Sequence, residues 1–404
     1  MPGPFVDTEI VLAITGSIAA YKACEIASRL IEAGARVTPV CTESGRKFVG
    51  ATTLEAITGH HAICEMFSPL DQPEIEHVTV AQRADLFLIA PATANIIAKA
   101  AHGIADDWLS TALLATRAPI LFAPAMNSHM YTHPATQANI KTLQARGCYF
   151  AGPGSGALAC GDTGPGRLIE ATAILESASI ILCKKKEFAG KHLLITSGAN
   201  HEPVDPVRFI GNRSSGRMGR ALALEALRRG ASVTVITGPV EVPLPHGAEV
   251  VPIRSALEML DAVNEHLETA HVFIAAAAVA DYHVDQPSDE KFKRNSESLT
   301  LTLVPNPDIA AHVGRVKRPD QISVGFAAES HDVVSNAMAK LDEKNLDLIV
   351  ANEIGGPACA IGADTSKAWF ITPKAPPRRF PRITKDELAE QIFDKIATFL
   401  PAPD

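Results

Sequence analysis

A glycine-rich stretch with a cysteine near its centre is the first place where this sequence could do chemistry. Residues 152–167 are rich in glycine and proline, which is typical of neither a helix nor a central strand, and they predict a mobile flap. Cys160 stands in this flap beside Asp162 and Arg167. The alternative is that Cys160 is a small, inert structural side chain. A buried structural cysteine, however, needs rigid apolar neighbours, which a glycine-rich loop lacks. The pattern therefore favours a reactive thiol that closes over a small molecule.

Polar residues also follow the apolar runs of the first half. They offer hydroxyls, amides and thioethers at Gly16, Ser17, Ser44, Thr93, Asn95, Met126, Asn127 and Met130. The pair Gly16-Ser17 at a helix start suits a phosphate, although many strand-to-helix turns carry this pair for conformational reasons. His77 precedes a short helical pattern, and a lone histidine is more often structural or exposed than catalytic.

The second half gathers anion-binding residue types. Asn212 and Arg213 precede Ser214, Ser215 and Gly216 at a predicted helix start, a plausible nest for an anion. Asp281 follows an apolar run and could hold Mg²⁺ or a hydroxyl. Lys291 opens a basic cluster that could neutralise a triphosphate, although ordinary surface charge explains this cluster better when it is taken alone. Lys340 and Lys344, which lie one helical turn apart, add two further cations.

These residues need a parallel sheet to bring them together. Apolar runs at residues 9–15, 37–42, 86–90 and 120–123 predict strands of a first α/β domain, and residues 192–196 and 272–275 predict strands of a second. Ligands of such sheets bind beyond the carboxyl ends of the strands, where the polar residues stand. A basic joint at residues 184–190 separates the halves, so we expect domains at residues 1–189 and 190–404.

Composition bounds the class of protein. The 404 residues suffice for two domains, and a net charge of −8 with a pI near 6 argues against general binding to nucleic acid or to anionic membranes. The sequence shows neither a membrane-spanning apolar run nor a signal-peptide layout, which predicts a cytoplasmic protein. Seven cysteines without paired metal-ligand spacing indicate reduced thiols.

Five motifs of the first half stand in a recognisable order: residues 16–20, His77, residues 90–95, residues 124–127 and the Cys160 flap. Together they resemble the flavin-dependent cysteine decarboxylases, specifically the phosphopantothenoylcysteine decarboxylases. The resemblance implies a flavodoxin-like, Rossmann-type domain with FMN bound at Gly16, Ser17, Ser44, Thr93 and Asn95. One departure is Tyr131, where this family usually has tryptophan.

The same resemblance implies a mechanism. FMN oxidises the cysteinyl thiol of the substrate, and the resulting thioaldehyde accepts the electrons left by the departing carbon dioxide. His77 takes part in the oxidation and decarboxylation, Asn127 binds the substrate carboxylate region, and Cys160 protonates the enethiol product. FMN lies between subunits in this family, typically in a trimer, so a homo-oligomer is implied.

The second half, from about Lys191 to the late 390s, resembles phosphopantothenate–cysteine ligase of the CTP-using bacterial type. The resemblance implies a nucleotide-binding parallel-sheet domain in which the substrate carboxylate attacks CTP with Mg²⁺, and the amine of cysteine then attacks the acyl-cytidylate. Asn212 would handle the acyl intermediate, Arg208 and Arg213 are candidates for the substrate phosphate, and no metal ligand is assigned. The implied CTP site consists of Asp281, Lys291, Pro307, Asp308, Ile309, Ala310, Phe326, Lys340 and Lys344. Departures from the family pattern stand at residues 199–201, Phe292 and Arg294.

The two resemblances predict one enzyme for two successive steps toward coenzyme A, with small molecules as its partners. A regulatory flavin-binding subunit without turnover is an alternative, which the joint presence of His77, Asn127 and Cys160 disfavours. An unrelated peptidyl-cysteine decarboxylase is another, and it predicts no dependence on CTP.

Overall fold

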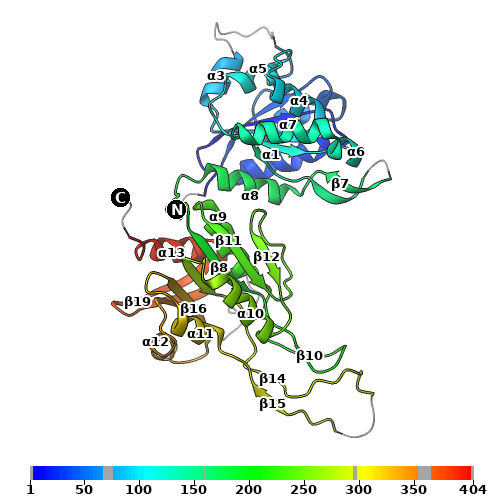
Figure 1. Cartoon of the computed structure of the whole chain (residues 1–404). Coiled ribbons are helices and arrows are strands. Elements are labelled where there is room, and N and C mark those ends of the chain that lie inside the picture. The colour runs from blue at the N-terminus through cyan, green and yellow to red at the C-terminus, as the bar shows by residue number, and fades with distance from the viewer. Residues whose placement is uncertain (1–2, 67–75, 159–160, 294–297, 354–364, 402–404) are drawn as a thin grey trace. The chain divides into compact units, whose positions relative to one another are not determined.

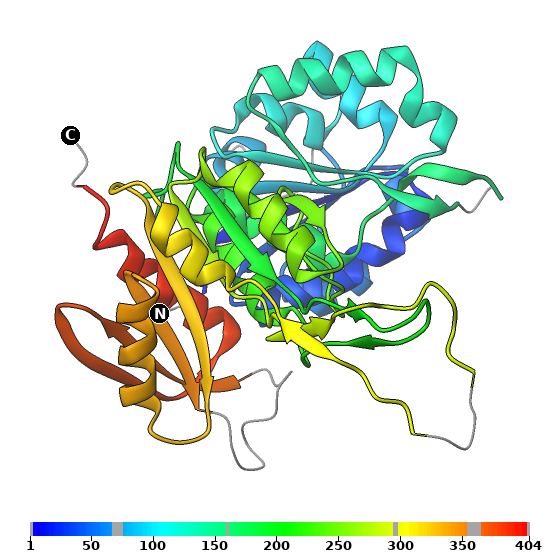
Figure 2. The same ribbon diagram turned by 60° about the horizontal axis from the view of Figure 1, so that its bottom comes forward.

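The computed structural model describes residues 3–66, 76–158, 161–293, 298–353 and 365–401. The chain divides into two compact units, Met1–Cys183 and Lys184–Asp404, and each is built on a largely parallel sheet (Figure 1, Figure 2). The predicted class, α/β with two Rossmann-like domains, is confirmed. The assignment of one activity to residues 1–189 and the other to residues 190–404 stays a prediction.

The first unit holds a parallel sheet in the order β2-β1-β3-β4-β5, which is the flavodoxin-like order. Its strands are β1 (Glu9–Ile14), β2 (Arg36–Cys41), β3 (Leu86–Ala92), β4 (Ile120–Pro124) and β5 (Tyr149–Phe150). Its helices are α1 (Ala23–Glu32), α2 (Ala51–Thr58), α3 (Glu76–Arg83), α4 (Ala94–His102), α5 (Trp108–Ala115), α6 (Ser128–Thr132), α7 (Pro134–Ala145) and α8 (Ala171–Leu182). Short 3₁₀ turns span Ile18–Lys22 and Gly45–Lys47.

Both faces of this sheet are buried, which explains the continuous apolar runs of the sequence. Along β1, Ile10, Leu12 and Ile14 pack with residues of α1, α2 and α8. Val11 and Ala13 point the other way and pack with residues of α3, α4, α5 and α7. Consequently β1 after its first residue and the whole of β3 carry no polar side chain.

The glycine-rich stretch forms a two-stranded antiparallel hairpin apart from the main sheet. Its strands are β6 (Gly154–Ala157) and β7 (Thr163–Arg167). Residues 159–160, and with them Cys160, lie outside the residues that the structure describes. The hairpin agrees with the expectation that this stretch is neither a helix nor a central strand.

The second unit is organised around a sheet in the order β12-β11-β8-β13-β16-β17-β18-β19. The strands from β12 to β17 are parallel and follow the dinucleotide-fold order, whereas β18 and β19 are antiparallel additions. The strands of this sheet are β8 (His192–Ser197), β11 (Ser232–Thr237), β12 (Glu249–Pro252), β13 (Val272–Ala275), β16 (Ile322–Glu329), β17 (Leu348–Glu353), β18 (Thr365–Thr372) and β19 (Ala375–Thr384). The helices are α9 (Arg217–Arg228), α10 (Ala256–Leu267), α11 (Ile309–Val316), α12 (Val333–Glu343) and α13 (Lys385–Ala397).

Helices cover both faces of this second sheet as well. Leu193 and Ile195 of β8 pack with residues of α9 and α13, whereas Leu194 packs with residues of α10 and α11. Two short antiparallel pairs lie outside the main sheet, β9 (Glu202–Pro203) with β10 (Phe209–Ile210) and β14 (Tyr282–Val284) with β15 (Leu303–Pro305). Figure 1 shows β14 and β15 on an arm that projects away from the main sheet.

A fully buried arginine joins α9 to α13 in the second unit. The guanidinium of Arg229, which has no exposed surface, lies 2.7 Å from a carboxylate oxygen of Glu225 and 2.8 Å from one of Asp394. It also donates to the backbone carbonyl of Glu390 and lies over the ring of Phe393. These two carboxylates, together with that of Glu187 at 3.7 Å, compensate the buried charge, and the helix pair is held together.

Replacing Arg229 by Met should destabilise the second unit by about 3–5 kcal/mol, because two carboxylates would lose their buried partner. The two tryptophans of the chain, Trp108 and Trp369, lie in different units. Urea unfolding followed by Trp369 fluorescence in a Trp108→Phe background therefore reports on the second unit. The exposed Arg315 is the control, and Arg315→Met should change stability by less than about 0.5 kcal/mol. Equal midpoints for the two variants would contradict the assigned role of Arg229.

Candidate functional site

The strand-end loops of the first unit and the hairpin line one cavity of about 620 Å³. Gly16 and Ser17 follow β1, Thr93 follows β3, and Asn127 follows β4. From the hairpin side the cavity is lined by Ala157, Leu158, Gly166, Arg167 and Leu168, and the remaining lining residues include Lys22, Met126 and Met130. The volume lies within the range of about 300–1,000 Å³ that small-molecule sites occupy.

The turn after β1 is packed closely against the loop that follows β2. A Cβ at Gly16 would lie only 2.5 Å from the Cβ of Ser44, so the close approach requires glycine there. Ser44 thus lies directly behind the Gly16 turn, whereas Asn95 is the second residue of α4, and neither lines the cavity. The buried hydroxyl of Thr15 donates to the carbonyl of Pro91 at 2.6 Å and ties the ends of β1 and β3 together.

Asn127 connects the loop after β4 to the hairpin. Its carboxamide oxygen accepts from the backbone N–H of His129 at 2.8 Å, and its nitrogen donates to Asp162 at 2.9 Å. The N–H of Met126 donates to the carbonyl of Gly166 at 2.9 Å. The carboxamide of Asn127 is therefore held at the cavity by partners on both sides.

His77 lies apart from this group. It is a half-buried residue in the first turn of α3 and does not belong to the described lining of the cavity. Its role and that of Cys160 stay predictions.

Gly166 allows the hairpin to approach the loop after β4. Its φ is +138°, and a Cβ there would lie 2.2 Å from the carbonyl oxygen of Met126. Gly166→Ala should therefore displace the hairpin and speed hydrogen exchange of the Met126 amide roughly tenfold or more, because that amide donates to residue 166.

The matched control for this prediction is Gly154→Ala in the same hairpin. A Cβ at Gly154 would meet its nearest neighbour, Ile169, at 3.4 Å, which is ordinary contact. Exchange at Met126 should be unchanged in this control. Unchanged exchange in Gly166→Ala as well would show that the hairpin is not held in this way.

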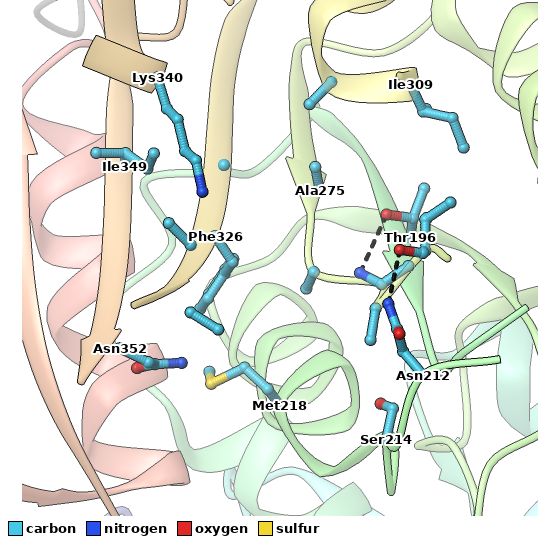
Figure 3. Close-up of a pocket in the computed structure, with 18 of the residues that line it drawn as sticks. Thr196, Asn212, Ser214, Met218, Ala275, Ile309, Phe326, Lys340, Ile349 and Asn352 are labelled. Carbon is cyan, nitrogen blue, oxygen red and sulfur yellow. Dashed lines mark hydrogen bonds between the residues drawn. The ribbon is translucent and has the colours of Figure 1, made fainter. Parts of the chain in front are cut away.

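The second unit has a larger cavity of about 770 Å³ at the carboxyl edge of its parallel strands (Figure 3). Asn212 and Arg213 line it, together with residues 275–281 from the last residue of β13 onward and residues 306–310 at and before the start of α11. Every residue of the CTP site implied by the sequence lines this cavity except Lys291. Met218, Phe326 and Asn352 lie across the cavity from Asn212, as Figure 3 shows.

Two lysines of this cavity are held by carboxylates. Lys344 lies 2.8 Å from Asp308, which also accepts from the backbone N–H of Ala311 at the start of α11. Burial alone would raise the pKa of Asp308, but the ammonium and the backbone N–H groups outweigh it and lower that pKa. Lys340 lies 2.6 Å from Glu329.

Three carboxamides fix the loop that follows β13. Asn212 donates to the carbonyl of Val279 and Asn306 to that of Ala280, each at 2.8 Å. The fully buried Asn200 accepts from the N–H of Ala280 at 2.7 Å and donates to Glu202. Asn200 therefore holds this loop in place through buried hydrogen bonds.

Arg208 and Lys291 lie elsewhere. The guanidinium of Arg208 contacts Asp205 at 2.5 Å and the carbonyl of Phe292 at 3.3 Å, and neither Arg208 nor Lys291 lines the cavity. Asp205 also accepts from the backbone N–H groups of Val207, Arg208 and Phe292. The two motifs that the sequence assigned to phosphate binding are thus linked to each other through Asp205.

The hydrogen bonds to Asp205 should make the stability of the second unit depend on pH. Burial would raise the pKa of Asp205, but three backbone N–H groups and Arg208 lower it from 3.8 to about 2. The ionised carboxylate therefore contributes stability that is fully present above about pH 4 and is lost as pH falls toward about 2. The stability gap between the wild type and Asp205→Asn should be larger at pH 7 than at pH 3 in urea unfolding.

The control for Asp205 is the exposed Asp289 in the same unit, where Asp289→Asn should leave the urea midpoint at pH 7 unchanged. A gap for Asp205→Asn that is constant between pH 7 and pH 3 would contradict the assigned pKa shift.

Sequence reasoning missed one end of the larger cavity. Thr365, Ser366 and Lys367 at the start of β18 line it, as does Lys385 at the start of α13. The signal that could have found Lys385 is the capping box Thr384–Glu387, which fixes where α13 begins.

The described residues contain neither a metal-binding cluster nor a helix that could span a membrane. Within the described ranges, no group of three or more His, Cys, Asp or Glu side chains is arranged to hold a metal ion. In the same part of the chain, no helix combines the length and apolar character needed to cross a bilayer.

Two family models match the chain, one for each unit. Residues 5–180 match the model described as Flavoprotein, and residues 188–400 match that of the DNA/pantothenate metabolism flavoprotein C-terminal domain. With the flavodoxin-like strand order and the two cavities, these matches define a two-domain flavoprotein of pantothenate metabolism.

Relatives that match nearly the whole chain identify the family more closely. The coenzyme A biosynthesis bifunctional protein CoaBC of Bacillus subtilis is 42% identical over 394 residues, which cover 97% of each chain. That of Escherichia coli K12 is 40% identical over 393 residues, covering 96% of this chain and 97% of the relative. The chain therefore belongs to the CoaBC family of bifunctional coenzyme A biosynthesis proteins, and the resemblance to a decarboxylase–ligase enzyme is confirmed at the level of this family.

Among solved structures, the chain is similar to the C-terminal domain of a coenzyme A biosynthesis bifunctional protein CoaBC. The identity is 34% and the TM-score is 0.46, with 53% of this chain and 97% of that chain covered.

Proposed function

We propose that this chain catalyses CTP-dependent ligation of cysteine to phosphopantothenate and then FMN-dependent decarboxylation of the product to phosphopantetheine. The observation that carries the proposal is that each described unit has a cavity at the carboxyl edge of its parallel sheet. Gly16, Ser17, Thr93 and Asn127 line the smaller cavity, and Asn212, Arg213 and all the implied CTP residues except Lys291 line the larger one. Membership of the CoaBC family supports the same pairing of activities. We infer a cytoplasmic protein from the sequence pattern and a homo-oligomer from the family resemblance.

The ligation belongs to the larger cavity. A carboxylate oxygen of phosphopantothenate attacks the α-phosphorus of CTP, and the bond to the β-phosphate breaks to release pyrophosphate. The amine of cysteine then attacks the acyl carbon, CMP leaves, and the amine loses a proton as the amide forms. Lys340 and Lys344 supply positive charge for the nucleotide, and Asp281 would hold Mg²⁺ together with phosphate oxygens.

Asn212 would orient the acyl group. Its amide nitrogen donates to the carbonyl of Val279, which fixes its orientation at the cavity. A carboxamide held in this way can orient an acyl-cytidylate without adding charge to the site. Phe326 offers an aromatic face in the same cavity, which suits the flat base of CTP.

The smaller cavity fits a flavin in its donor set. Gly16, Ser17 and Thr93 offer backbone N–H groups and hydroxyls for the polar end, and Met126 and Met130 offer polarisable side chains for a ring. Bound there, FMN supplies a two-electron oxidation of the substrate thiol and returns the electrons later.

The chain's own side chains would handle the substrate and its protons. Asn127, held between His129 and Asp162, would bind the substrate carboxylate until carbon dioxide leaves. Cys160 would deliver a proton to the enethiol product, and the hairpin would exclude water while it does so. His77 would take part in the earlier steps, as the family resemblance implies.

Two matched variants should separate the activities. Asn212→Ala should lower CTP-dependent pyrophosphate release by about tenfold or more, because the acyl group loses its orienting amide, yet still decarboxylate added phosphopantothenoylcysteine. Asn127→Ala should do the reverse, with the flavin absorption band of the purified protein retained. Pyrophosphate and carbon dioxide are measured separately in each case.

Each variant is the control for the other. A wild-type chain that shows a flavin band but releases no carbon dioxide would favour a regulatory subunit. Carbon dioxide release from a peptidyl-cysteine, without any use of CTP, would favour the other alternative.

A further inference from the structure

The larger cavity extends beyond the nucleotide residues toward the antiparallel edge of its sheet. Because β18 is antiparallel to β17, the first residues of β18 lie at the same edge of the sheet as the carboxyl end of β17. Asn352 near the end of β17, Ser366 in β18 and Lys385 in α13 all line the cavity, and we name them the Lys385 corner. Neither the sequence motifs nor the proposed chemistry uses this corner.

Lys385 stands in an unfavourable place for a cation. It is the first residue of α13, where the positive end of the helix dipole repels an ammonium. It is half-buried, and burial lowers the pKa of its ammonium group. Its hydrogen-bond partner is a neutral hydroxyl, that of Ser366, at 2.5 Å.

The other lysines that line the cavity are all paired. Lys340 contacts Glu329, Lys344 contacts Asp308, and Lys367 contacts Glu353 at 3.5 Å. Lys385, by contrast, forms no ion pair with any residue that the structure describes. A half-buried cation facing a cavity without a carboxylate partner is arranged to receive an anion that enters the cavity.

Other groups at the corner are suited to the same ligand. The carboxamide oxygen of Asn352 is buried and has no hydrogen-bond partner in the described part of the chain. Rotation of this carboxamide exchanges its oxygen and its NH₂ group, so that the NH₂ group can donate to a phosphate at this position. Met218 lines the same cavity as Asn352 and is in the first turn of α9, a helix of 12 residues whose start has no side-chain cap and no acidic residue. The backbone N–H groups of that turn favour an anion. Glu353 is compensated by Lys367 and Arg379, at 3.5 and 3.6 Å.

We propose that the Lys385 corner binds a phosphate group of one of the two phosphorylated substrates of the ligase, with Lys385 as its charged ligand. The proposal rests on the proposed ligase activity. Arg208 was expected to bind the substrate phosphate, but it contacts Asp205 and does not line the cavity. Lys385 would supply a cation for a phosphate in the cavity instead. The phosphate could belong to either substrate: to the triphosphate of CTP or to the phosphate monoester of phosphopantothenate.

The test compares Lys385→Met with Lys385→Arg in the full chain, and Lys395→Met at the other end of α13 is the control. Pyrophosphate release is measured with CTP varied and then with phosphopantothenate varied. Loss of the cation should raise KM for one of these substrates roughly tenfold or more, with a smaller change in kcat. Arginine should retain most of the affinity, and Lys395→Met should behave as the wild type.

The substrate whose KM rises identifies the source of the phosphate. A rise for CTP alone assigns the corner to the triphosphate, and a rise for phosphopantothenate alone assigns it to the monoester. Unchanged KM values for both substrates in Lys385→Met would overturn the proposal.

A second measurement does not require turnover. Inorganic phosphate or pyrophosphate should raise the Tm of the wild type and of Lys385→Arg more than that of Lys385→Met. Equal shifts in all three proteins would overturn the proposal. A chain that shows the Lys385-dependent shift but no ligation would keep the corner as an anion site and remove the ligase function, so the two failures are distinguishable.

Discussion

Burial of both faces of a parallel sheet is the constraint on which this structure depends. In β1 and in β8, every residue after the first is buried, so no charged or catalytic side chain can be accommodated along these strands. Functional groups must stand where the strands end, and both cavities lie there. Loops at such ends are free to move unless something holds them. The hydrogen bond from Thr15 to Pro91 in one unit and that from Ala280 to Asn200 in the other provide this restraint.

The same constraint explains why the fold could be predicted from the sequence. Strands buried on both faces are continuous apolar runs, and the predicted strands at residues 86–90 and 272–275 correspond to β3 and β13. The antiparallel end of the second sheet was not predicted. β19 is an edge strand that carries three prolines, Pro376, Pro377 and Pro381, together with exposed arginines, and such a sequence has no apolar run to reveal it. Lys385 follows this strand directly.

Candidate residues were harder to predict than strands, because residue type does not reveal which partner a side chain takes. Arg208 and Arg213 stand in one polar loop and look equivalent in the sequence. In the fold, Arg208 contacts a carboxylate three residues before it, whereas Arg213 lines the cavity. Asp205 also affects Lys291, because the backbone N–H of Phe292, the next residue, donates to Asp205. Lys291 consequently does not line the cavity. The glycine of the hairpin is the opposite case, because the contact that requires Gly166 lies forty residues earlier in the chain and only the fold brings it there.

Neutral carboxamides anchor both cavities, and their neutrality has a physical consequence. Asn127, Asn200 and Asn212 each fix a loop by donating or accepting hydrogen bonds without adding a formal charge. The substrates that we propose carry phosphates and carboxylates, so a carboxylate used as an anchor would repel them, and an additional lysine would bind them in competing positions. Positive charge is supplied instead by lysines such as Lys340 and Lys344. Each of them is paired with a carboxylate, which reduces the net positive charge at the cavity. Geometry can therefore be set by uncharged groups, while attraction for the anionic substrates depends on the few cations that face the cavity.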